Sequence, residues 1–192
     1  MAHITIIGTG SMANAIGGLF ADGGSSVTYV ARESVGTATI DGDIAVLAVP
    51  YPAVDGIVST YADQLAGKTV VDITNPLNFE TFDELVVPAG SSAAAEIQAK
   101  LPASHVVKAF NTNFAATLAS KKVGELGTTV LIAGDDANSK AQLAAAIEAG
   151  GVAALDAGAL SRAHELEALG FLQLTAAVGE KLPWTGGFAV AR

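Results

Sequence analysis

The stretch His3-Ile4-Thr5-Ile6-Ile7-Gly8-Thr9-Gly10-Ser11-Met12-Ala13 decides the fold. Its short apolar run with β-branched residues predicts a buried strand, and the Gly-x-Gly-x-x-Ala pattern then leads directly into a helix. Gly8 permits the tight turn, Gly10 leaves room for a pyrophosphate beside the backbone, and Ala13 lets the helix pack close to the strand. The free N–H groups at the start of that helix would hold the phosphates.

A glycine-rich turn after a strand also occurs in proteins that bind nothing there, so its context matters. Small or apolar residues continue along one helix face at Ala13, Ile16, Gly17 and Phe20, and a second strand is expected at Ser26–Ala31. This order of elements favours dinucleotide binding over a plain tight turn. The residues expected to contact the cofactor here are Gly8, Thr9, Gly10, Ser11, Met12 and Ala13.

Length and charge limit the domain organisation and the partners. The 192 residues suffice for one well-packed domain but are few for a nucleotide domain with a full substrate domain. We expect one domain over 1–192, with 155–192 as a C-terminal elaboration that lies at an interface. Ten Lys and Arg against 19 Asp and Glu give a net charge of −9, which repels nucleic acid and anionic membrane surfaces, so neither is an expected partner.

Composition also excludes several kinds of site. The chain has no cysteine, which excludes disulfides, thiolate catalysis and cysteine-ligated metals. His3, His105 and His164 lie far apart without metal-ligand spacing, so no metal site is expected. No apolar run reaches the length of a membrane span and no signal peptide is recognisable, so we expect a soluble cytoplasmic protein.

The end of the second expected strand bears on the choice of cofactor. An acidic residue there would bind the adenosine ribose of NAD, whereas an arginine accommodates the 2′-phosphate of NADP. The strand ends at Ala31-Arg32, and Arg32 with Thr9 and Ser34 would surround a phosphate with a fixed charge and hydroxyl groups. NADP is therefore the expected cofactor. Two alternatives are that Glu33 binds the ribose of NAD and that Arg32 is only a solvated loop charge.

The connection 33–42 is too short and too rich in Gly, Ser and Thr for an ordinary crossover helix. We expect a trimmed connection that leaves the adenosine side of the site open. The next strand, 43–49, stops at Pro50, and a helix from Pro52 through Tyr61 follows.

Three expected strands end in prolines, amides and hydroxyl groups instead of further apolar residues. In an open parallel sheet, the carboxyl ends of the strands border the ligand crevice. Strands at 43–49, 68–73 and 105–110 would bring such residues to this edge. The residues expected to position the nicotinamide and exclude water are Ala48, Val49, Pro50, Asn75, Pro76 and Asn111.

The remainder of the chain completes an alternation of strands and helices. Expected helices are 91–100, 137–149 and 161–180, and expected strands are 128–133 and 152–156. The polar connection 79–90 is a lid or a surface loop, and the tail from Lys181 to Phe188 has no clear periodicity. The pattern predicts an α/β fold of the Rossmann type, with a doubly wound, mainly parallel sheet and a short C-terminal helical elaboration.

Familiar proton-transfer residues for carbonyl reduction are missing. The tyrosines Tyr29, Tyr51 and Tyr61 lack a lysine four residues on, and no His pairs convincingly with an acidic residue. No catalytic residue is therefore expected. Hydride transfer between nicotinamide and a second heteroaromatic ring needs no such residue, because the rings carry the chemistry.

Other noticeable residues have simpler interpretations. His105 marks a strand boundary, and Lys108 either approaches a phosphate or leaves the sheet into solvent, because lysine is rarely buried. His164 and Glu167 share a helix face, where a polar surface is favoured over a catalytic pair. Trp184 and Phe188 cover either a second ring or a subunit interface, and the interface is favoured.

Several motifs, in this order along nearly the whole chain, resemble the coenzyme F420-dependent NADP oxidoreductase family. The resemblance implies hydride transfer between NADP(H) and a deazaflavin or a flavin (FMN or FAD), in a homo-oligomer for which a homodimer is expected. It also implies that Thr9 and Arg32 bind the 2′-phosphate, and that Val49-Pro50 and Asn75-Pro76 line the nicotinamide pocket. The family includes the flavin-using domains of ferric reductases. The motifs are Ile7-Gly8-Thr9-Gly10, Ala31-Arg32, Ala48-Val49-Pro50, Thr74-Asn75-Pro76-Leu77, Val107-Lys108-Ala109-Phe110-Asn111-Thr112, Ala133-Gly134-Asp135-Asp136 and Asp156-Ala157-Gly158-Ala159-Leu160.

A second hypothesis belongs to another functional class. The chain could be a module that binds NADPH as a signal without catalysing hydride transfer. Tight NADPH binding without transfer to any acceptor would favour this hypothesis over the enzyme.

Overall fold

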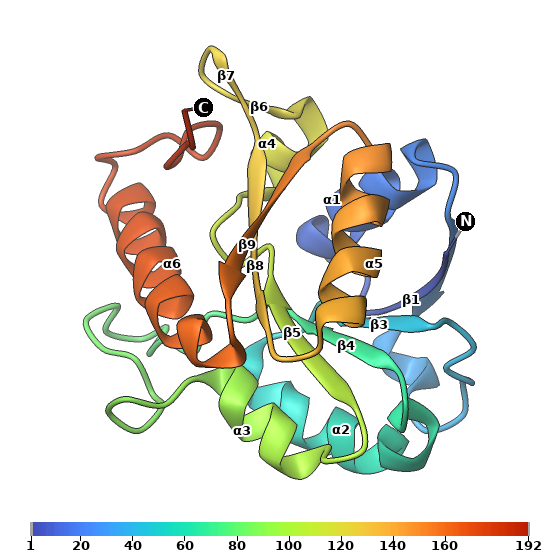
Figure 1. Cartoon of the computed structure of the whole chain (residues 1–192). Coiled ribbons are helices and arrows are strands. Elements are labelled where there is room, and N and C mark those ends of the chain that lie inside the picture. Colours follow the sequence, from blue (N-terminus) through green and yellow to red (C-terminus); the bar gives the residue numbers. More distant parts are fainter. Residues whose placement is uncertain (1, 192) are drawn as a thin grey trace.

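A seven-stranded sheet with helices on both faces forms the centre of the computed structural model, which describes residues 2–191 (Figure 1). The strand order is β2-β1-β3-β4-β5-β8-β9. All neighbours are parallel except β5 and β8, which pair antiparallel. The strands are β1 (His3–Ile7), β2 (Ser26–Val30), β3 (Ile44–Leu47), β4 (Thr69–Asp72), β5 (His105–Ala109), β8 (Thr129–Gly134) and β9 (Ala153–Gly158).

The helices form one layer on each face of the sheet. Figure 1 shows α5 close to α1, while α2 and α3 lie side by side on the opposite face and α6 has its first turns next to α3. The helices are α1 (Ser11–Asp22), α2 (Tyr51–Leu65), α3 (Ala93–Lys100), α4 (Ala115–Ser120), α5 (Ala137–Ala149) and α6 (Ala163–Val178). Short 3₁₀ turns lie at Arg32–Ser34 and Leu160–Arg162, and β6 (Lys122–Val123) pairs with β7 (Leu126–Gly127) in a small hairpin.

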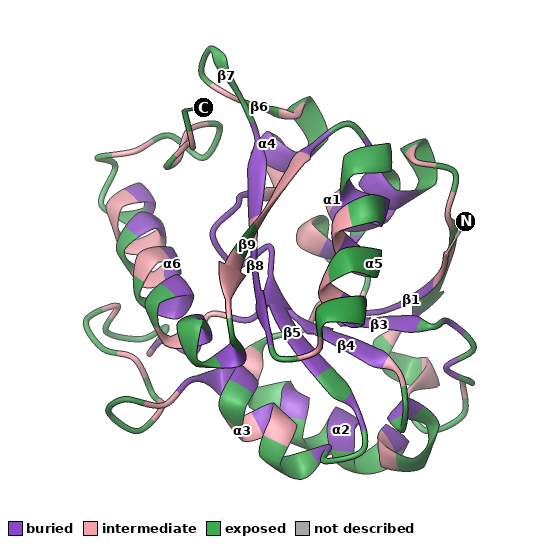
Figure 2. Cartoon of the chain, viewed as in Figure 1, coloured by how far each residue is buried: buried purple, intermediate pink, exposed green. Residues whose placement is uncertain are grey.

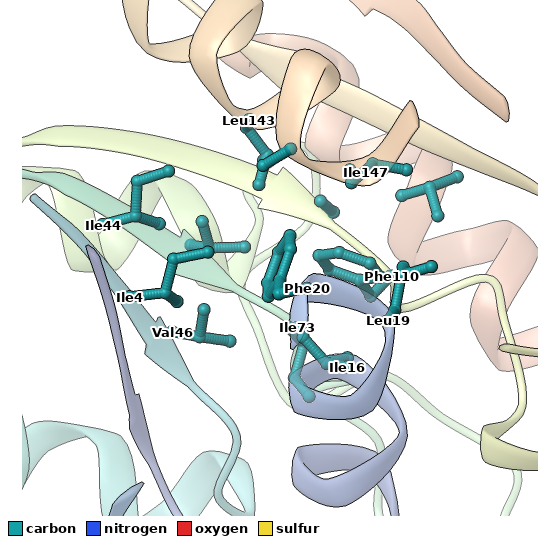
Figure 3. Close-up of a cluster of buried hydrophobic side chains, with 14 of the residues drawn as sticks. Ile4, Ile16, Leu19, Phe20, Ile44, Val46, Ile73, Phe110, Leu143 and Ile147 are labelled. Carbon is teal, nitrogen blue, oxygen red and sulfur yellow. The ribbon is translucent and has the colours of Figure 1, made fainter. Parts of the chain in front are cut away.

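Both faces of the central strands are buried, which explains their near-continuous apolar sequences (Figure 2). On one face, Ile4 and Ile6 pack with residues of α1 and α5 (Figure 3). Phe20 and Phe110 meet there edge to face, with their ring centroids 5.9 Å apart. On the other face, Ile7 packs with the apolar residues of α2 and α3. The two apolar clusters fix the helices against the sheet and so fix the strand ends that they flank.

The structure confirms the expected Rossmann-type α/β fold and most element boundaries to within two residues. Asp136 caps α5 as its sequence position predicts, because its side chain accepts a hydrogen bond from the N–H of Ser139 at 2.7 Å. The connection 33–42 contains only the 3₁₀ turn, so the trimmed crossover is also confirmed. The β6–β7 hairpin and the antiparallel direction of β8 were not expected from the sequence.

The segment between β4 and α3 is a surface connection without a regular helix or strand. Its two ends are held together by an isolated bridge between Leu77 and Leu85 and by a hydrogen bond from the N–H of Asn78 to the carbonyl oxygen of Glu84. Of the helices in residues 2–191, none is long and apolar enough to cross a membrane.

Candidate nucleotide site

The strand order places a ligand crevice at the carboxyl ends of β1 and β3. Strand β2 lies on one side of β1 and β3 lies on the other, so the two successive connections run in opposite directions. Such a reversal leaves a crevice between the two connections at the carboxyl edge of the sheet. Helix α1 begins at this point, and a hollow lies on each side of its N-terminus.

The first hollow, which we call the Arg32 hollow, has a volume of about 580 Å³. It lies between the ends of β1 and β2 and the start of α2. Arg32 is the one titratable side chain among its lining residues. Those residues are Ile7, Gly8, Thr9, Gly10, Val30, Arg32, Val35, Ala48, Val49, Pro50, Pro52, Ala53 and Ile57.

Gly8 and Gly10 of the first turn are glycine for different structural reasons. Gly8 has a φ of +122°, and a Cβ atom there would overlap the carbonyl oxygen of Ala48, so the fold itself requires glycine. Gly10 has an ordinary φ of −73°, and a Cβ atom there would have no neighbour within 4 Å. Packing therefore gives no reason for glycine at Gly10, whereas a phosphate that approached the backbone closely would give one.

The N-terminus of α1 is open to an anion. No side chain caps the helix at Gly10, and its first turn contains no acidic residue. The first N–H groups of a helix lack partners within the helix and carry its positive dipole end. Asn14 supports the preceding loop, since its side chain donates to the carbonyl oxygen of Thr9 at 3.1 Å. The arrangement suits a phosphate at the boundary between the two hollows.

Arg32 extends from the 3₁₀ turn after β2 and is exposed. No carboxylate within residues 2–191 forms an ion pair with its guanidinium group, whereas Arg162 is paired with Glu165. A free guanidinium group beside a nucleotide crevice is suited to a phosphate. Ser34, which was expected to join it, lies in the same turn but outside the residues that line the hollow.

The second hollow, which we call the Asn111 hollow, has a volume of about 390 Å³. It lies between the start of α1, the ends of β4 and β5, and α6. Its walls are mainly apolar and carry three amide side chains. The lining residues are Ser11, Met12, Ile73, Asn75, Phe110, Asn111, Asn113, Phe114, Ala115, Ala116, Gly170, Leu174 and Trp184.

Asn75 and Asn111 form a reciprocal amide pair in this second hollow. The Asn75 side chain donates to the carbonyl oxygen of Asn111 at 2.9 Å, and the Asn111 side chain donates to Oδ1 of Asn75 at 3.0 Å and to the carbonyl oxygen of Leu166 at 2.8 Å. A Cβ atom at Gly170 would overlap Oδ1 of Asn75, so α6 approaches this pair as closely as glycine allows.

Phe110 is held in an unusual conformation beside that pair. It is fully buried and has a φ of +64°, which is rare for a bulky residue. Such conformations persist where the surrounding structure enforces them, often at ligand sites. Sequence reasoning missed Phe110 and Gly170; the position of Phe110 directly before Asn111 was the available signal.

The structure divides the expected site residues between the two hollows. Seven of them line the Arg32 hollow: Gly8, Thr9, Gly10, Arg32, Ala48, Val49 and Pro50. Ser11, Met12, Asn75 and Asn111 line the Asn111 hollow. Ala13 is buried on the inner face of α1 and Pro76 is buried beyond the end of β4, and neither lines a hollow. Val49 and Pro50 thus line the Arg32 hollow, Asn75 lines the Asn111 hollow, and Pro76 lines neither.

Two interpretations of charged residues were wrong. Lys108 neither reaches a phosphate nor leaves the sheet: it is fully buried, with Nζ 2.8 Å from Oδ2 of Asp72 and 2.8 Å from Oε1 of Glu167. Glu167 is also fully buried and is not part of a polar surface. Burial raises the pKa of Glu167 above its ordinary value, although the Lys108 ammonium group opposes the rise. The carboxylates make it possible to bury the lysine.

His105, His164 and Trp184, which are discussed above, lie at separate places in the fold. His105 begins β5 at an exposed position, as expected for a boundary residue. A ring nitrogen of His164 lies 3.0 Å from the carbonyl oxygen of Ser91. Trp184 packs on Phe114 with ring centroids 4.9 Å apart and lines the Asn111 hollow. Within the described part of the chain, no group of three His, Asp or Glu side chains is placed to hold a metal ion.

Comparison with known proteins confirms the family resemblance. The family model for "NADP oxidoreductase coenzyme F420-dependent" matches residues 30–76. The F420-dependent NADP reductase of Methanocaldococcus jannaschii is 30% identical over 133 residues, which cover 67% of this chain and 59% of that protein. Metalloreductase STEAP3 of Rattus norvegicus is 32% identical over 181 residues, which cover 86% of this chain and 36% of that protein.

The same fold occurs in a candidate F420-dependent NADP reductase from Arthrobacter sp. FB24. The two structures superpose with a TM-score of 0.86 over 100% of both chains, at 23% identity. The chain spans 59% and 36% of the lengths of the two relatives above. It is thus related in sequence to NADP-dependent oxidoreductases and shares their fold.

Proposed function

We propose that this relative of the F420-dependent NADP oxidoreductases transfers hydride between NADP(H) and a flat heteroaromatic acceptor, either the deazaflavin F420 or a flavin. The observation that carries the proposal is the division of the site into two hollows by the uncapped N-terminus of α1. A dinucleotide has this shape, because two ring systems flank a central pyrophosphate. The two volumes lie within the usual range of ligand sites, about 300 to 1,000 Å³.

The Arg32 hollow suits the adenosine half of NADP. Gly10 leaves its backbone open to the pyrophosphate, and the first turn of α1 offers its N–H groups. Arg32, without a carboxylate partner, would bind the 2′-phosphate, and the hydroxyl group of Thr9 would assist. The apolar side chains of Val35 and Ile57 would cover the adenine ring.

The Asn111 hollow suits the nicotinamide and the ring that faces it. When bound, NADPH would supply a hydride, which is a hydrogen nucleus with two electrons, and the acceptor ring would take up this hydride and one proton from solvent, leaving NADP⁺. The chain contributes orientation and exclusion of water. Phe110, Phe114 and Leu174 give apolar walls, and the Asn75–Asn111 pair fixes a polar edge. None of the residues that line this hollow is titratable, which supports transfer without a protein acid or base.

Stopped-flow or steady-state measurement of NADPH absorbance tests the proposal directly. The protein is mixed with NADPH and, in separate reactions, with F420, FMN and FAD. We expect oxidation of NADPH with at least one of these acceptors and a much lower rate with NADH. Tight binding of NADPH with no turnover on any acceptor would contradict the enzyme and support a non-catalytic NADPH-sensing module.

We also propose that the protein acts as a homodimer through the outer face of α6 and the C-terminal tail. Large apolar side chains are exposed there, namely Leu172, Val178, Trp184 and Phe188. Large apolar side chains exposed on one helix and on the tail that follows it are the kind of surface that a second subunit would cover. Light scattering after size exclusion measures the mass, and we expect a dimer that Leu172→Glu converts to a monomer. A monomeric wild-type protein at micromolar concentration would contradict this proposal.

A further inference from the structure

Helix α6 meets the sheet through polar and small residues instead of a broad apolar stripe. Its buried residues are Ala163, Leu166, Glu167, Gly170, Gln173 and Ala177, of which Leu166 is the one large apolar side chain. Gln173 donates to the carbonyl oxygen of Thr112 at 3.0 Å and accepts from the N–H of Phe188 at 2.9 Å. A helix face of this kind gains little from burial of apolar area, so specific polar contacts must set where α6 lies.

One of these contacts is a buried charge group, Asp72–Lys108–Glu167, which we call the lysine trio. Asp72 and Lys108 lie opposite each other in the parallel register of β4 and β5, and Glu167 comes from α6. The Lys108 ammonium group also donates to the carbonyl oxygen of Thr74 at 2.5 Å. All three side chains are fully buried, so each charge depends on the others.

The lysine trio connects the elements that enclose the Asn111 hollow. Oδ1 of Asp72 accepts from the N–H of Thr74 at 2.8 Å, which fixes the backbone immediately before Asn75. Oε2 of Glu167 accepts from the N–H of Ala93 at 2.9 Å, at the start of α3. One helical turn beyond Glu167, Gly170 closes on the Asn75–Asn111 pair. The trio therefore sets the distance between α6 and the ends of β4 and β5.

We propose that Lys108 and Glu167 are positioning residues for hydride transfer: the lysine trio holds α6 at the distance at which the Asn111 hollow orients the acceptor ring over the nicotinamide. This inference rests on the proposed function. It predicts a separation of effects, because the Arg32 hollow has no lining residue in α6 or in the trio. Loss of the trio would impair the acceptor side and leave the adenosine side unchanged.

Two substitutions disrupt the lysine trio, and a third displaces α6 while leaving the trio residues unchanged. Lys108→Met deletes the cation, and Glu167→Gln deletes one negative charge at nearly constant volume. Gly170→Ala places a methyl group against Asn75 and pushes α6 outward. Lys121→Met is the matched control, because Lys121 forms a partly exposed pair with Asp22 away from the site.

Three measurements are made on each variant. Steady-state kinetics gives the KM for the acceptor and for NADPH. Calorimetry with adenosine 2′,5′-bisphosphate reports the adenosine side without catalysis. Acrylamide quenching of Trp184, the single tryptophan of the chain, reports how the tail packs over Phe114.

We expect the acceptor KM to rise about tenfold or more in Glu167→Gln and Lys108→Met, with stronger quenching of Trp184, since small displacements at a reacting pair are costly. Affinity for the bisphosphate should stay within about twofold of wild type. Gly170→Ala should show the same pattern, and Lys121→Met should match wild type. If Lys108→Met does not fold, Glu167→Gln and Gly170→Ala decide the matter.

A folded Glu167→Gln variant with an unchanged acceptor KM would overturn the proposal. A loss of bisphosphate affinity equal to the rise in acceptor KM would overturn it as well. If the wild-type protein turns over no acceptor, the proposed function fails. In that case the quenching of Trp184 still decides whether the lysine trio holds α6: unchanged quenching in Glu167→Gln would overturn that placement as well.

Discussion

The hydroxyl group of Tyr61 accepts a hydrogen bond from the backbone N–H of Gly36 at 2.9 Å. The same hydroxyl donates to the carbonyl oxygen of Ser34 at 3.4 Å. Tyr61 is a residue of α2 and is almost fully buried. Its hydroxyl group therefore attaches the short connection that contains Arg32 to α2. The connection between β2 and β3 has no crossover helix, and the two hydrogen bonds of Tyr61 hold it against α2 instead.

Removal of this hydroxyl group should weaken binding of the 2′-phosphate without direct contact to it. We expect Tyr61→Phe to raise the Kd for NADPH roughly twofold to tenfold, the range of one lost hydrogen bond of about 0.5–1.5 kcal/mol, because the Arg32 turn becomes less ordered. The Kd for NADH should hardly change. Fluorescence titration with both nucleotides measures this, and Tyr29→Phe at an exposed position of β2 is the control.

Arg32 itself should distinguish the two nucleotides more strongly. A hydrogen bond to a charged group contributes about 1.5–3 kcal/mol, so Arg32→Ala should raise the Kd for NADPH by roughly ten- to a hundredfold. Affinity for NADH should stay near its wild-type value. Arg162→Ala, which removes an exposed arginine paired with Glu165, is the matched control. An equal loss of affinity for NADPH and for NADH would show that Arg32 does not recognise the 2′-phosphate.

Most of the fold is predictable because strands buried on both faces leave apolar runs that turn residues interrupt. Local signals of this kind are the Ile44–Leu47 run, the glycine turn that ends at Gly10, and the Asp136 cap of α5. The direction of β8 is not local. The chain passes from β5 through α4 and the β6–β7 hairpin before β8 pairs antiparallel with β5, and no single residue pattern specifies this path.

The site was predictable where it depends on strand ends, and not where it depends on contacts distant in sequence. Asn75 and Asn111 stand out because polar residues follow apolar runs. The burial of Lys108 depends on Glu167, which a separate helix brings to the sheet. Asp72 was nevertheless a usable signal, since it lies opposite Lys108 on the neighbouring strand. The division into two hollows required the position of α1, which no single motif contains.

The two glycines of the first turn give a test that separates folding from binding. Gly8→Ala should lower the Tm markedly, because its Cβ atom overlaps Ala48 and the residue has a positive φ. Gly10→Ala should leave the Tm within a few degrees of wild type, because its Cβ atom meets nothing within 4 Å, while NADPH binding falls about tenfold or more. Scanning calorimetry and nucleotide titration measure the two effects. Normal NADPH affinity in Gly10→Ala would mean that the pyrophosphate lies elsewhere.

Asp136 should make part of the stability depend on pH. Hydrogen bonds from Ser139 hold the pKa of this carboxyl group below its ordinary value of 3.8, with a smaller contribution from nearby His105. A carboxyl group whose pKa is lowered in the folded state contributes stability above its unfolded pKa, and this contribution is lost as the pH falls through the folded pKa. We therefore expect the urea midpoint to fall between about pH 5 and about pH 3 by more in wild type than in Asp136→Asn, which keeps an N-cap acceptor but does not titrate. Identical pH profiles for the two proteins would show that the α5 cap contributes nothing to the acid sensitivity.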